Sequence, residues 1–229
     1  MMKAIQIHGQ SKLINDVLCY TKLKKYEILL LSFMLLIFGD TFSNNLKVLD
    51  VMNIYQNMLT GAFVFFNRKA IRNTIFLLIL FSLILDVVQS YNATISFRSW
   101  HSIIYLVFFS LVSKEVYKQV LYAKTVTREL LAAAMCGFVL LCLMSTFLFY
   151  EIETSQVHSF SNTGEGREVM FNLNYFSFTT LLTIGFGDIA PVSLLAKRAV
   201  MFIGLVGHFY TVFITSIIIG KYLNVKKVE

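Results

Sequence analysis

The stretch that decides the fold of this chain is T-I-G-F-G-D, formed by Thr183, Ile184, Gly185, Phe186, Gly187 and Asp188. It follows an apolar, aromatic and threonine-rich run over residues 174–182 and precedes the only proline, Pro191. Glycine tolerates backbone angles that other residues avoid, so glycines alternating with bulky apolar residues allow successive backbone carbonyls to point the same way. The hexapeptide is a candidate for a segment with a row of carbonyl oxygens on one side. The composition of the chain and the sequence around the hexapeptide have to distinguish this from a chance turn.

A phosphate-binding loop is the main chemical alternative for a glycine-rich stretch. Such loops carry G-x-G-x-x-G or G-x-x-x-x-G-K-[ST] between a strand and a helix, and neither pattern occurs around Gly185 and Gly187. No catalytic constellation is recognisable, because the four histidines are scattered and no nucleophile stands beside a base. The sequence therefore predicts neither a nucleotide site nor an enzyme.

The composition indicates a membrane protein. The 229 residues are 57% hydrophobic and 14% charged, with a mean hydropathy of +0.69, whereas soluble domains carry about 25% charged residues. The net charge of +7 would suggest nucleic acid as a partner of a soluble protein. Here most basic residues flank apolar segments, which indicates membrane topology and lipid contact instead.

The chain contains six apolar stretches, at residues 28–39, 51–67, 73–85, 99–113, 130–150 and 199–220. A membrane-spanning helix needs about 20 apolar residues, so the last two suffice, whereas the first four are shorter between charges. No small-x-small cleavage site follows the first stretch, which favours a retained helix over a signal peptide. The expected fold is an all-α integral membrane protein with six transmembrane helices.

The distribution of basic residues predicts the orientation of these helices. With the N-terminus in the cytoplasm, fifteen Lys and Arg fall on the inner side and five on the outer side, in keeping with the positive-inside rule. The inner residues are Lys3, Lys12, Lys22, Lys24, Lys25, Arg68, Lys69, Arg72, Lys114, Lys118, Lys124, Arg128, Lys221, Lys226 and Lys227, and the outer ones are Lys47, Arg98, Arg167, Lys197 and Arg198. Both termini are therefore expected in the cytoplasm.

The segment between the last two apolar stretches predicts a re-entrant element. Residues 154–168 are polar and form an expected exposed turret, whereas residues 169–182 are apolar but are followed at once by glycines. A half-membrane helix that returns as extended backbone accounts for this pattern. Irregular backbone at membrane depth is tolerated where it lines a cavity or is buried in protein, and a pore offers both.

Residues 175–188, Y-F-S-F-T-T-L-L-T-I-G-F-G-D, resemble the pore helix and selectivity filter of tetrameric potassium channels. Phe186 replaces the commoner tyrosine, and Leu182 stands where many members carry a second threonine. The resemblance covers roughly residues 130–223, and the first four helices only in number and orientation. It implies a homotetramer that conducts potassium ions and needs no cofactor.

The resemblance also implies roles for the hexapeptide. Thr183 is expected to offer its hydroxyl and its carbonyl to K⁺ at the inner end of the filter, and Ile184, Gly185 and Phe186 to supply stacked carbonyls. The side chains of Ile184 and Phe186 are expected to pack against the pore helix. Gly187 and Asp188 are expected to form the outer mouth, where the carboxylate attracts cations.

Four residues of the last apolar stretch are candidates for the cavity or for gating. Gly207 falls where the family has a hinge glycine, or it is a close-packing glycine between helices. Thr211 and Thr215 share one helical face and either line the cavity or bond to their own backbone. His208 is an ionisable group at membrane depth, or a neutral histidine between helices.

The first four helices are expected to form a voltage-sensor-like unit without a charge ladder. Residues 99–113 contain no Arg or Lys, so strong voltage gating is not expected. Asp86 interrupts the third helix, where it either faces a polar stripe formed by Asn53, Gln56, Asn57 and Thr60 or, the favoured alternative, joins helices through polar contacts. The expected organisation is a cytoplasmic segment (1–25), a four-helix domain (26–113), an interfacial linker (114–129), a pore domain (130–223) and a short tail (224–229).

The sequence therefore predicts a potassium-selective ion channel in the plasma (inner) membrane of a prokaryote, with no soluble regulatory domain. Three alternatives stay open at this stage: a poorly selective cation channel, a non-conducting accessory membrane protein, and a potassium transporter subunit. The intact T-I-G-F-G disfavours the first two, because selectivity relies on several successive carbonyl rings. The transporter alternative is disfavoured because such a chain usually carries four pore repeats, and one is present here.

Overall fold

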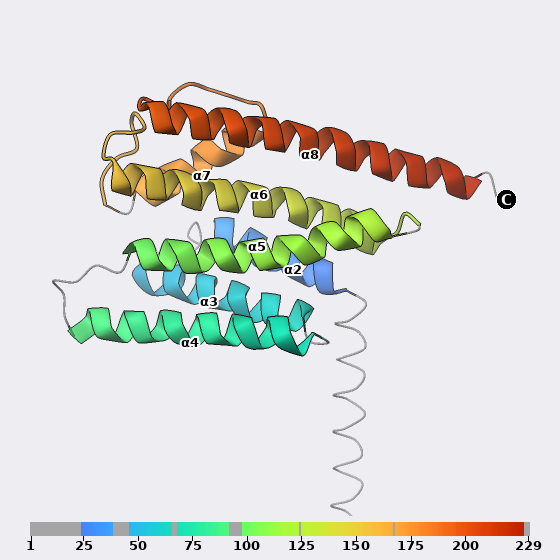
Figure 1. Ribbon diagram of the computed structural model, residues 1–229, viewed down its shortest axis with the longest axis horizontal. Helices are drawn as coiled ribbons and strands as arrows, with labels where there is room; N and C mark the ends of the chain where they lie inside the picture. Colours follow the sequence, from blue (N-terminus) through green and yellow to red (C-terminus); the bar gives the residue numbers. More distant parts are fainter. Residues whose placement is uncertain are drawn as a thin grey trace, which may run out of the picture.

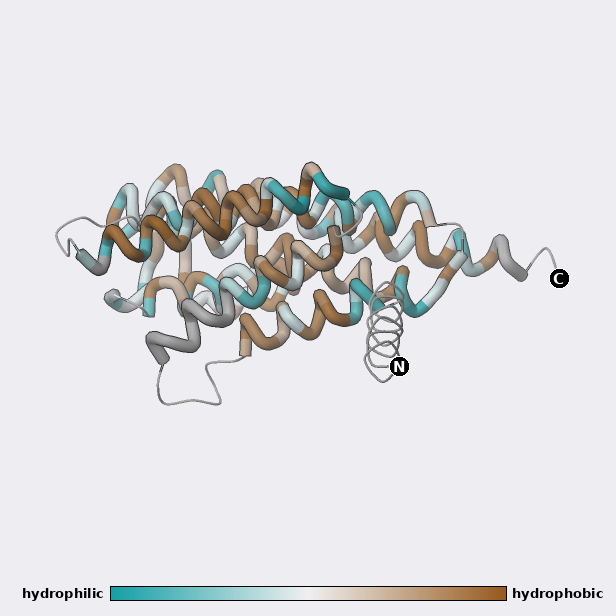
Figure 2. Tube along the Cα trace, turned by 90° about the horizontal axis from the view of Figure 1, so that it is seen from below, coloured by the Kyte–Doolittle hydropathy of each residue, from teal (hydrophilic) through white to brown (hydrophobic). Residues whose placement is uncertain are grey.

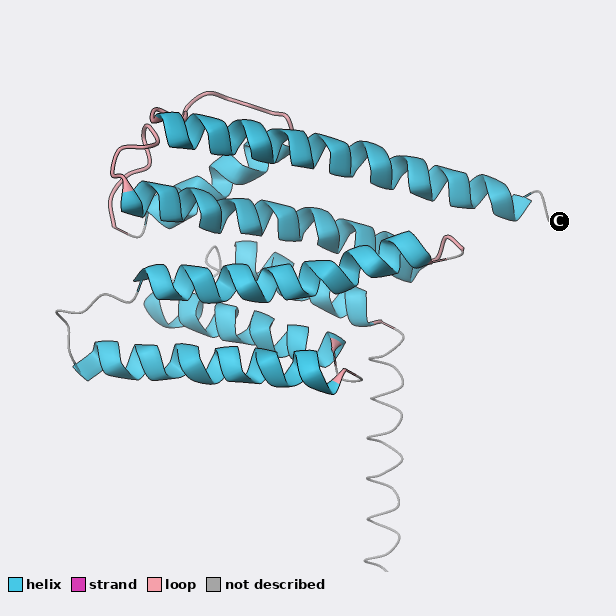
Figure 3. Ribbon diagram, viewed as in Figure 1, coloured by secondary structure: helices cyan, strands magenta, loops and turns pink. Residues whose placement is uncertain are grey.

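The computed structural model describes residues 24–38, 46–65, 68–91, 98–123, 125–166 and 168–226. In this part of the chain the regular elements are helices (Figures 1 and 3): α2 (Lys25–Phe38), α3 (Leu46–Val64), α4 (Lys69–Tyr91), α5 (Arg98–Tyr122), α6 (Arg128–Ser155), α7 (Glu168–Leu181) and α8 (Leu194–Lys226). The prediction of an all-α fold is confirmed for these residues. Residues 1–23 of the predicted N-terminal segment and 227–229 of the predicted tail lie outside them.

Three helices of the described chain are long and apolar enough to cross a membrane. They are Lys69–Gln89 within α4, Arg128–Ser155 and Leu194–Leu223 within α8. By contrast, α2 has 14 residues, which at 1.5 Å per residue span about 21 Å of a hydrocarbon core about 30 Å thick. A helix lies at each of the six predicted stretches, and six membrane crossings stay a prediction.

The long helices lie side by side, with α6 at the centre of the fold. In Figure 1, α7 and α8 lie above α6, and α5, α2, α3 and α4 lie below it. α6 contacts α2, α5, α7 and α8, and 78% of its candidate span is buried, against 17% for α4 and 11% for α8. Figure 2 shows apolar residues along most of the length of the helices. A helix that is apolar all round is expected at such a buried position.

The start of α6 is fixed by a helix cap. Thr127 has extended backbone angles, and its side chain accepts a hydrogen bond from the amide of Leu130 at 3.2 Å. Glu129 lies in the first turn, where a negative charge interacts favourably with the helix dipole. The small residue Gly137 then allows α5 and α8 to approach, because a Cβ there would lie 2.9 Å from Tyr117 and 2.5 Å from the hydroxyl of Tyr210.

Aromatic rings join the four-helix unit, α2 to α5, to α6 of the same chain. The ring of Phe109 on α5 lies 6.2 Å from Phe33 on α2 and 5.7 Å from Phe147 on α6. Tyr105, one turn earlier on α5, lies 5.3 Å from Phe147. The four-helix unit therefore packs against the central helix of its own chain.

The fourth helix is longer than the sequence predicted. α5 does not end near Ser113 but continues to Tyr122, so the expected linker at 114–129 begins as the last turns of this helix. The buried side chains of Val116 and Val120 extend its apolar face, while exposed Lys114 and Lys118 obscure that face in the sequence. Residues 123–127 alone separate α5 from α6.

Asp86 does not pair with the polar stripe predicted on the second stretch. Asn57 of that stripe accepts a hydrogen bond from Ser32 of α2 at 2.8 Å, and Thr60 donates to the carbonyl of Gln56 at 2.9 Å. The side chain of Asn53 lies outside the described residues. Asp86 contacts Tyr55 and His101 instead, because the stripe faces α2 and its own helix turn.

Phe109→Ala tests the aromatic joint between α2, α5 and α6. Removing this buried ring is expected to lower the free energy of unfolding by about 3–5 kcal/mol, measured by thermal unfolding of the purified protein in detergent. Phe81→Ala is the control, because Phe81 is exposed on α4, and it should cost far less. If the two substitutions lowered the free energy of unfolding equally, the aromatic contact between α2, α5 and α6 would have no special stabilising role.

Candidate ion-binding site

α7 and the segment that follows it form a re-entrant hairpin. Figure 1 shows α7 running from one end of the helix bundle toward its middle, and the chain returning over it to the start of α8 at the same end. The hexapeptide Thr183 to Asp188, called the TIGFGD segment below, lies on this return path. We call that end of the bundle the TIGFGD end.

α7 is held against α6 by both polar and aromatic contacts. The hydroxyl of Thr146 on α6 donates a hydrogen bond to Asn174 of α7 at 3.0 Å. The rings of Phe149, Phe160 and Phe176 form a cluster with centroid separations of 5.4 to 5.6 Å. α7 is therefore a fixed support for the segment that follows it.

The backbone of the TIGFGD segment alternates in handedness. Thr183, Gly185 and Gly187 have φ angles of 58°, 62° and 81°, whereas Ile184 and Phe186 are not in the left-handed region. In a strand, successive carbonyls point to opposite sides. Alternating left- and right-handed residues instead align successive peptide groups, which is the backbone arrangement that a row of carbonyls on one side needs.

Hydrogen bonds show which side of the backbone faces α7. The amides of Ile184 and Gly185 both donate to the carbonyl of Thr179, at 2.8 and 3.3 Å, and the amide of Thr183 donates to that of Thr180 at 3.0 Å. Within the described chain, no hydrogen bond is accepted by the carbonyls of residues 183–187. The amides of Thr183, Ile184 and Gly185 are thus bonded to the last turn of α7, whereas their own carbonyls accept no hydrogen bond within the described residues.

The TIGFGD segment ends in a network around Asp188. The carbonyl of Asp188 accepts a hydrogen bond from the side chain of Asn162 at 2.7 Å, and its carboxylate accepts one from the amide of Ile189 at 3.1 Å. The side chain of Tyr175 on α7 also lies close to Asp188. Sequence reasoning missed Asn162 and Tyr175, because neither belongs to the hexapeptide.

The turret holds the chain that follows the hexapeptide. Its Ser161 amide donates to the carbonyl of Ala190 at 2.8 Å, and Phe160 forms an isolated bridge with Pro191. The buried carboxylate of Glu153 accepts the amides of His158 and Phe160, each at 2.9 Å. A glutamate near the end of an apolar helix was the signal in the sequence for this anchor.

The side chains of Ile184 and Phe186 do not pack as predicted. Within one chain they are 49% and 70% exposed, so the expectation that they pack against α7 is wrong for the single chain. The backbone amide of Ile184 donates to α7, while about half or more of each of the two side chains remains exposed. These two apolar side chains need another surface to cover them.

Gly207 is brought against the end of α7. A Cβ at Gly207 would overlap the side chain of Leu181, the last residue of α7, so this glycine permits close packing beneath the TIGFGD segment. Thr211 donates to the carbonyl of Gly207 at 3.0 Å and Thr215 to that of Thr211 at 2.7 Å. Of the two alternatives for these threonines, the structure shows hydroxyls bonded to their own helix. His208 is exposed, with its ring 6.5 Å from that of Phe209.

Gly207→Ala tests the close approach of α8 to α7. The added methyl group is expected to destabilise the protein by about 1–3 kcal/mol through overpacking, measured by thermal unfolding. In a Leu181→Ala background the same substitution should cost much less, because the opposing side chain is gone. Gly204→Ala on the same helix meets open space and is the control. If Gly207→Ala destabilised the protein as much in the Leu181→Ala background as in the wild type, the side chain of Leu181 would not be what the added methyl group meets.

One of three comparisons with known proteins matches the part of the chain that contains this site. Neither the curated proteins nor the solved structures contain a significant match to the chain. One family model, described as an ion channel, matches residues 135–223. The match begins within α6, ends within α8 and includes every predicted site residue, whereas α2 to α5 lie outside it. It spans less than half of the chain, and it supports an ion-channel domain over these residues.

Proposed function

We propose that this chain is a subunit of a potassium-selective ion channel, through which K⁺ moves passively across the membrane. The observation that carries the proposal is the alternating backbone of the TIGFGD segment, whose amides at Thr183, Ile184 and Gly185 are bonded to α7 and whose carbonyls at 183–187 accept no hydrogen bond within the described residues. A dehydrated K⁺ ion needs oxygen ligands in place of its water shell. These carbonyls are supplied by Thr183, Ile184, Gly185 and Phe186. Thr183 also supplies its hydroxyl, and Gly187 lies at the outer mouth of the filter.

The ion pathway is proposed to be formed by four copies of the chain. One chain offers oxygen atoms from one direction, whereas a filter surrounds the ion with rings of carbonyls from four subunits. Exposed apolar residues also continue along α8, namely Met201, Phe202, Leu205, Phe209, Val212 and Phe213. Neighbouring copies would cover part of this surface together with Ile184 and Phe186.

Two further features favour a cation. The C-terminal end of α7 lies next to the TIGFGD segment, and this end of a helix dipole is negative. The carboxylate of Asp188 adds a negative charge where the segment leaves the pore. Together with the unbroken T-I-G-F-G, these features support potassium selectivity over the poorly selective and non-conducting alternatives.

The proposed channel is not strongly voltage-gated. Voltage sensing of the familiar kind needs several charges that move through the membrane field. In α5 the membrane-depth residues 99–113 carry no Lys or Arg, and Lys114 and Lys118 follow only in the last turns. The proposed location is the plasma membrane of a prokaryote, with both termini and the basic connections in the cytoplasm.

Gly185→Ala and Gly187→Ala test the role of the TIGFGD backbone. Both glycines have positive φ and open space around them, so an added Cβ acts through backbone strain. In liposomes with opposed K⁺ and Na⁺ gradients, the wild-type reversal potential should follow K⁺, and each substitution should reduce the K⁺ current at least about tenfold, equivalent to about 1.4 kcal/mol.

Gly166→Ala is the matched control for these two substitutions. Gly166 lies in the turret with φ 62° and nothing near its Cβ position, so it adds similar strain away from the ion path. The K⁺ current of the Gly166→Ala protein should equal that of the wild type. A wild-type reversal potential that follows Na⁺ as closely as K⁺ would overturn the proposed selectivity.

The number of subunits is the second prediction of the proposal. The purified complex in mild detergent should have the mass of four chains of 26.2 kDa each, measured by native mass spectrometry. Phe202→Asp on the uncovered face of α8 should lower the share of this species, because a charge in an apolar interface is costly. A wild-type protein that is monomeric at every concentration would contradict a pore shared between copies.

A further inference from the structure

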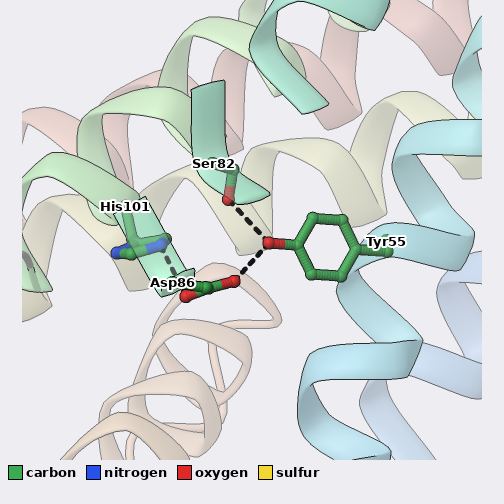
Figure 4. A network of polar contacts seen from close by, with 4 residues as sticks. All are labelled: Tyr55, Ser82, Asp86 and His101. Carbon is green, nitrogen blue, oxygen red and sulfur yellow. Dashed lines mark hydrogen bonds and ion pairs between the residues drawn. The ribbon is translucent and has the colours of Figure 1, made fainter. Parts of the chain in front are cut away.

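A polar cluster joins three helices of the four-helix unit, outside the matched channel domain. Figure 4 shows Tyr55 of α3, Ser82 and Asp86 of α4, and His101 of α5 pointing toward one another. Nε2 of His101 lies 3.0 Å from Oδ1 of Asp86. The hydroxyl of Tyr55 lies 3.1 Å from that of Ser82 and donates a hydrogen bond to Oδ2 of Asp86.

The cluster lies near the TIGFGD end of the bundle. Asp86 precedes the end of α4 at Tyr91, and His101 lies in the first turn of α5. The side chain of His101 is 15% exposed and that of Asp86 is 41% exposed. An acid within a candidate membrane span is costly and is often functional. Here it is partly buried against its partner, close to the end of the span.

The strength of the contact between His101 and Asp86 depends on whether His101 is protonated. The imidazole of His101 is charged only when it is protonated, and histidine is the side chain that ordinarily changes charge between pH 5 and 8. With the proton bound, His101 and Asp86 form an ion pair between α4 and α5. Without it, the Coulomb attraction is lost and Asp86 keeps its bond to Tyr55.

Other titratable and charged groups occur on α5 itself and on α6. The ring of Tyr105, on α5, lies 6.3 Å from that of His101. From α6, Glu151 lies one turn beyond Phe147, the residue that packs on Tyr105. A helical spacing of four residues places Glu151 on the same face as Phe147. Arg98 precedes His101 by three residues in the sequence.

α5 connects the cluster to the matched channel domain. It packs on α6 through Tyr105 and, further along, the hydroxyl of Tyr117 lies 3.4 Å from the carbonyl of Gly137. At its far end, the ammonium group of Lys221 on α8 donates to the carbonyls of Val120 and Leu121 at 2.7 and 3.1 Å. A change in how α5 is held at one end is therefore passed to both α6 and α8.

We propose that His101 and Asp86 form a proton-binding site at the TIGFGD end of α5, through which pH on that side of the membrane regulates the pore domain. Proton binding holds α5 to α4 and, through Tyr55, to α3, and proton release frees the outer end of α5. The regulation of current rests on the proposed channel function, whereas the proton site itself does not.

The first experiment measures the site without any current. The ion pair stabilises the fold while His101 is protonated, and this stabilisation is lost as the pH rises and the imidazole loses its proton. Between pH 6 and pH 8 the melting temperature of the purified full chain should therefore fall by roughly 2–4 °C more in the wild type than in His101→Gln. Asp86→Asn should behave as His101→Gln does.

His158→Asn is the matched control for the melting experiment. His158 is an exposed histidine of the turret with φ 67°, a conformation that asparagine tolerates. This variant should keep the full wild-type difference between the two pH values. The same pH dependence in wild type, His101→Gln and Asp86→Asn would overturn the proton site.

The second experiment measures regulation in liposomes, with the pH varied on the TIGFGD side. The wild-type K⁺ current should change by about fivefold or more between pH 6 and pH 8, in the range of an ordinary coupling between sites, and that of His101→Gln should stay constant. An equal response in both proteins would overturn the regulation. Absence of current at every pH would contradict the channel function, and the melting difference would still decide the proton site.

Discussion

The hydrogen bonds from the TIGFGD amides to the carbonyls of Thr179 and Thr180 are the interaction on which the rest of the structure depends. Within a bilayer an unsatisfied backbone group costs several kcal/mol, so irregular backbone must find partners inside the protein. The end of α7 accepts the amides of Thr183, Ile184 and Gly185. Within the described residues the carbonyls of 183–187 accept no hydrogen bond, and the proposed function assigns them to a desolvated cation.

This arrangement requires α7 to stay in place, and the neighbouring elements serve that purpose. α6 holds α7 through Thr146 and the ring cluster around Phe176. Glu153 of α6 holds the turret, and Asn162 of the turret holds the returning chain at Asp188. Gly207 allows α8 to approach the last residue of α7. Small residues at helix contacts serve this purpose commonly in membrane proteins, where close packing replaces the hydrophobic driving force.

The sequence predicted the helix positions well, because long apolar stretches and the charges that bound them are local signals. It predicted the two glycines as points of unusual backbone, but not the positive φ of Thr183, since β-branched residues ordinarily avoid that region. It placed a polar stripe on the second stretch, yet a spacing gives a face of a helix and not the neighbour opposite it. For this reason the two partners of Asp86, which are Tyr55 and His101, could be identified only in the structure. The exposure of Ile184 and Phe186 was also missed, because the prediction assumed packing that one chain does not provide.

The connection between α5 and α6 is short, and the aromatic joint it permits lies within one chain. A single chain can therefore complete its largest core, the one built around α6, before it meets another copy. In the proposed tetramer, the surfaces left for assembly are the TIGFGD segment and the exposed face of α8. Folding of the monomer and assembly of that tetramer would then be separable steps. A defect in the four-helix unit would remain confined to the subunit that carries it.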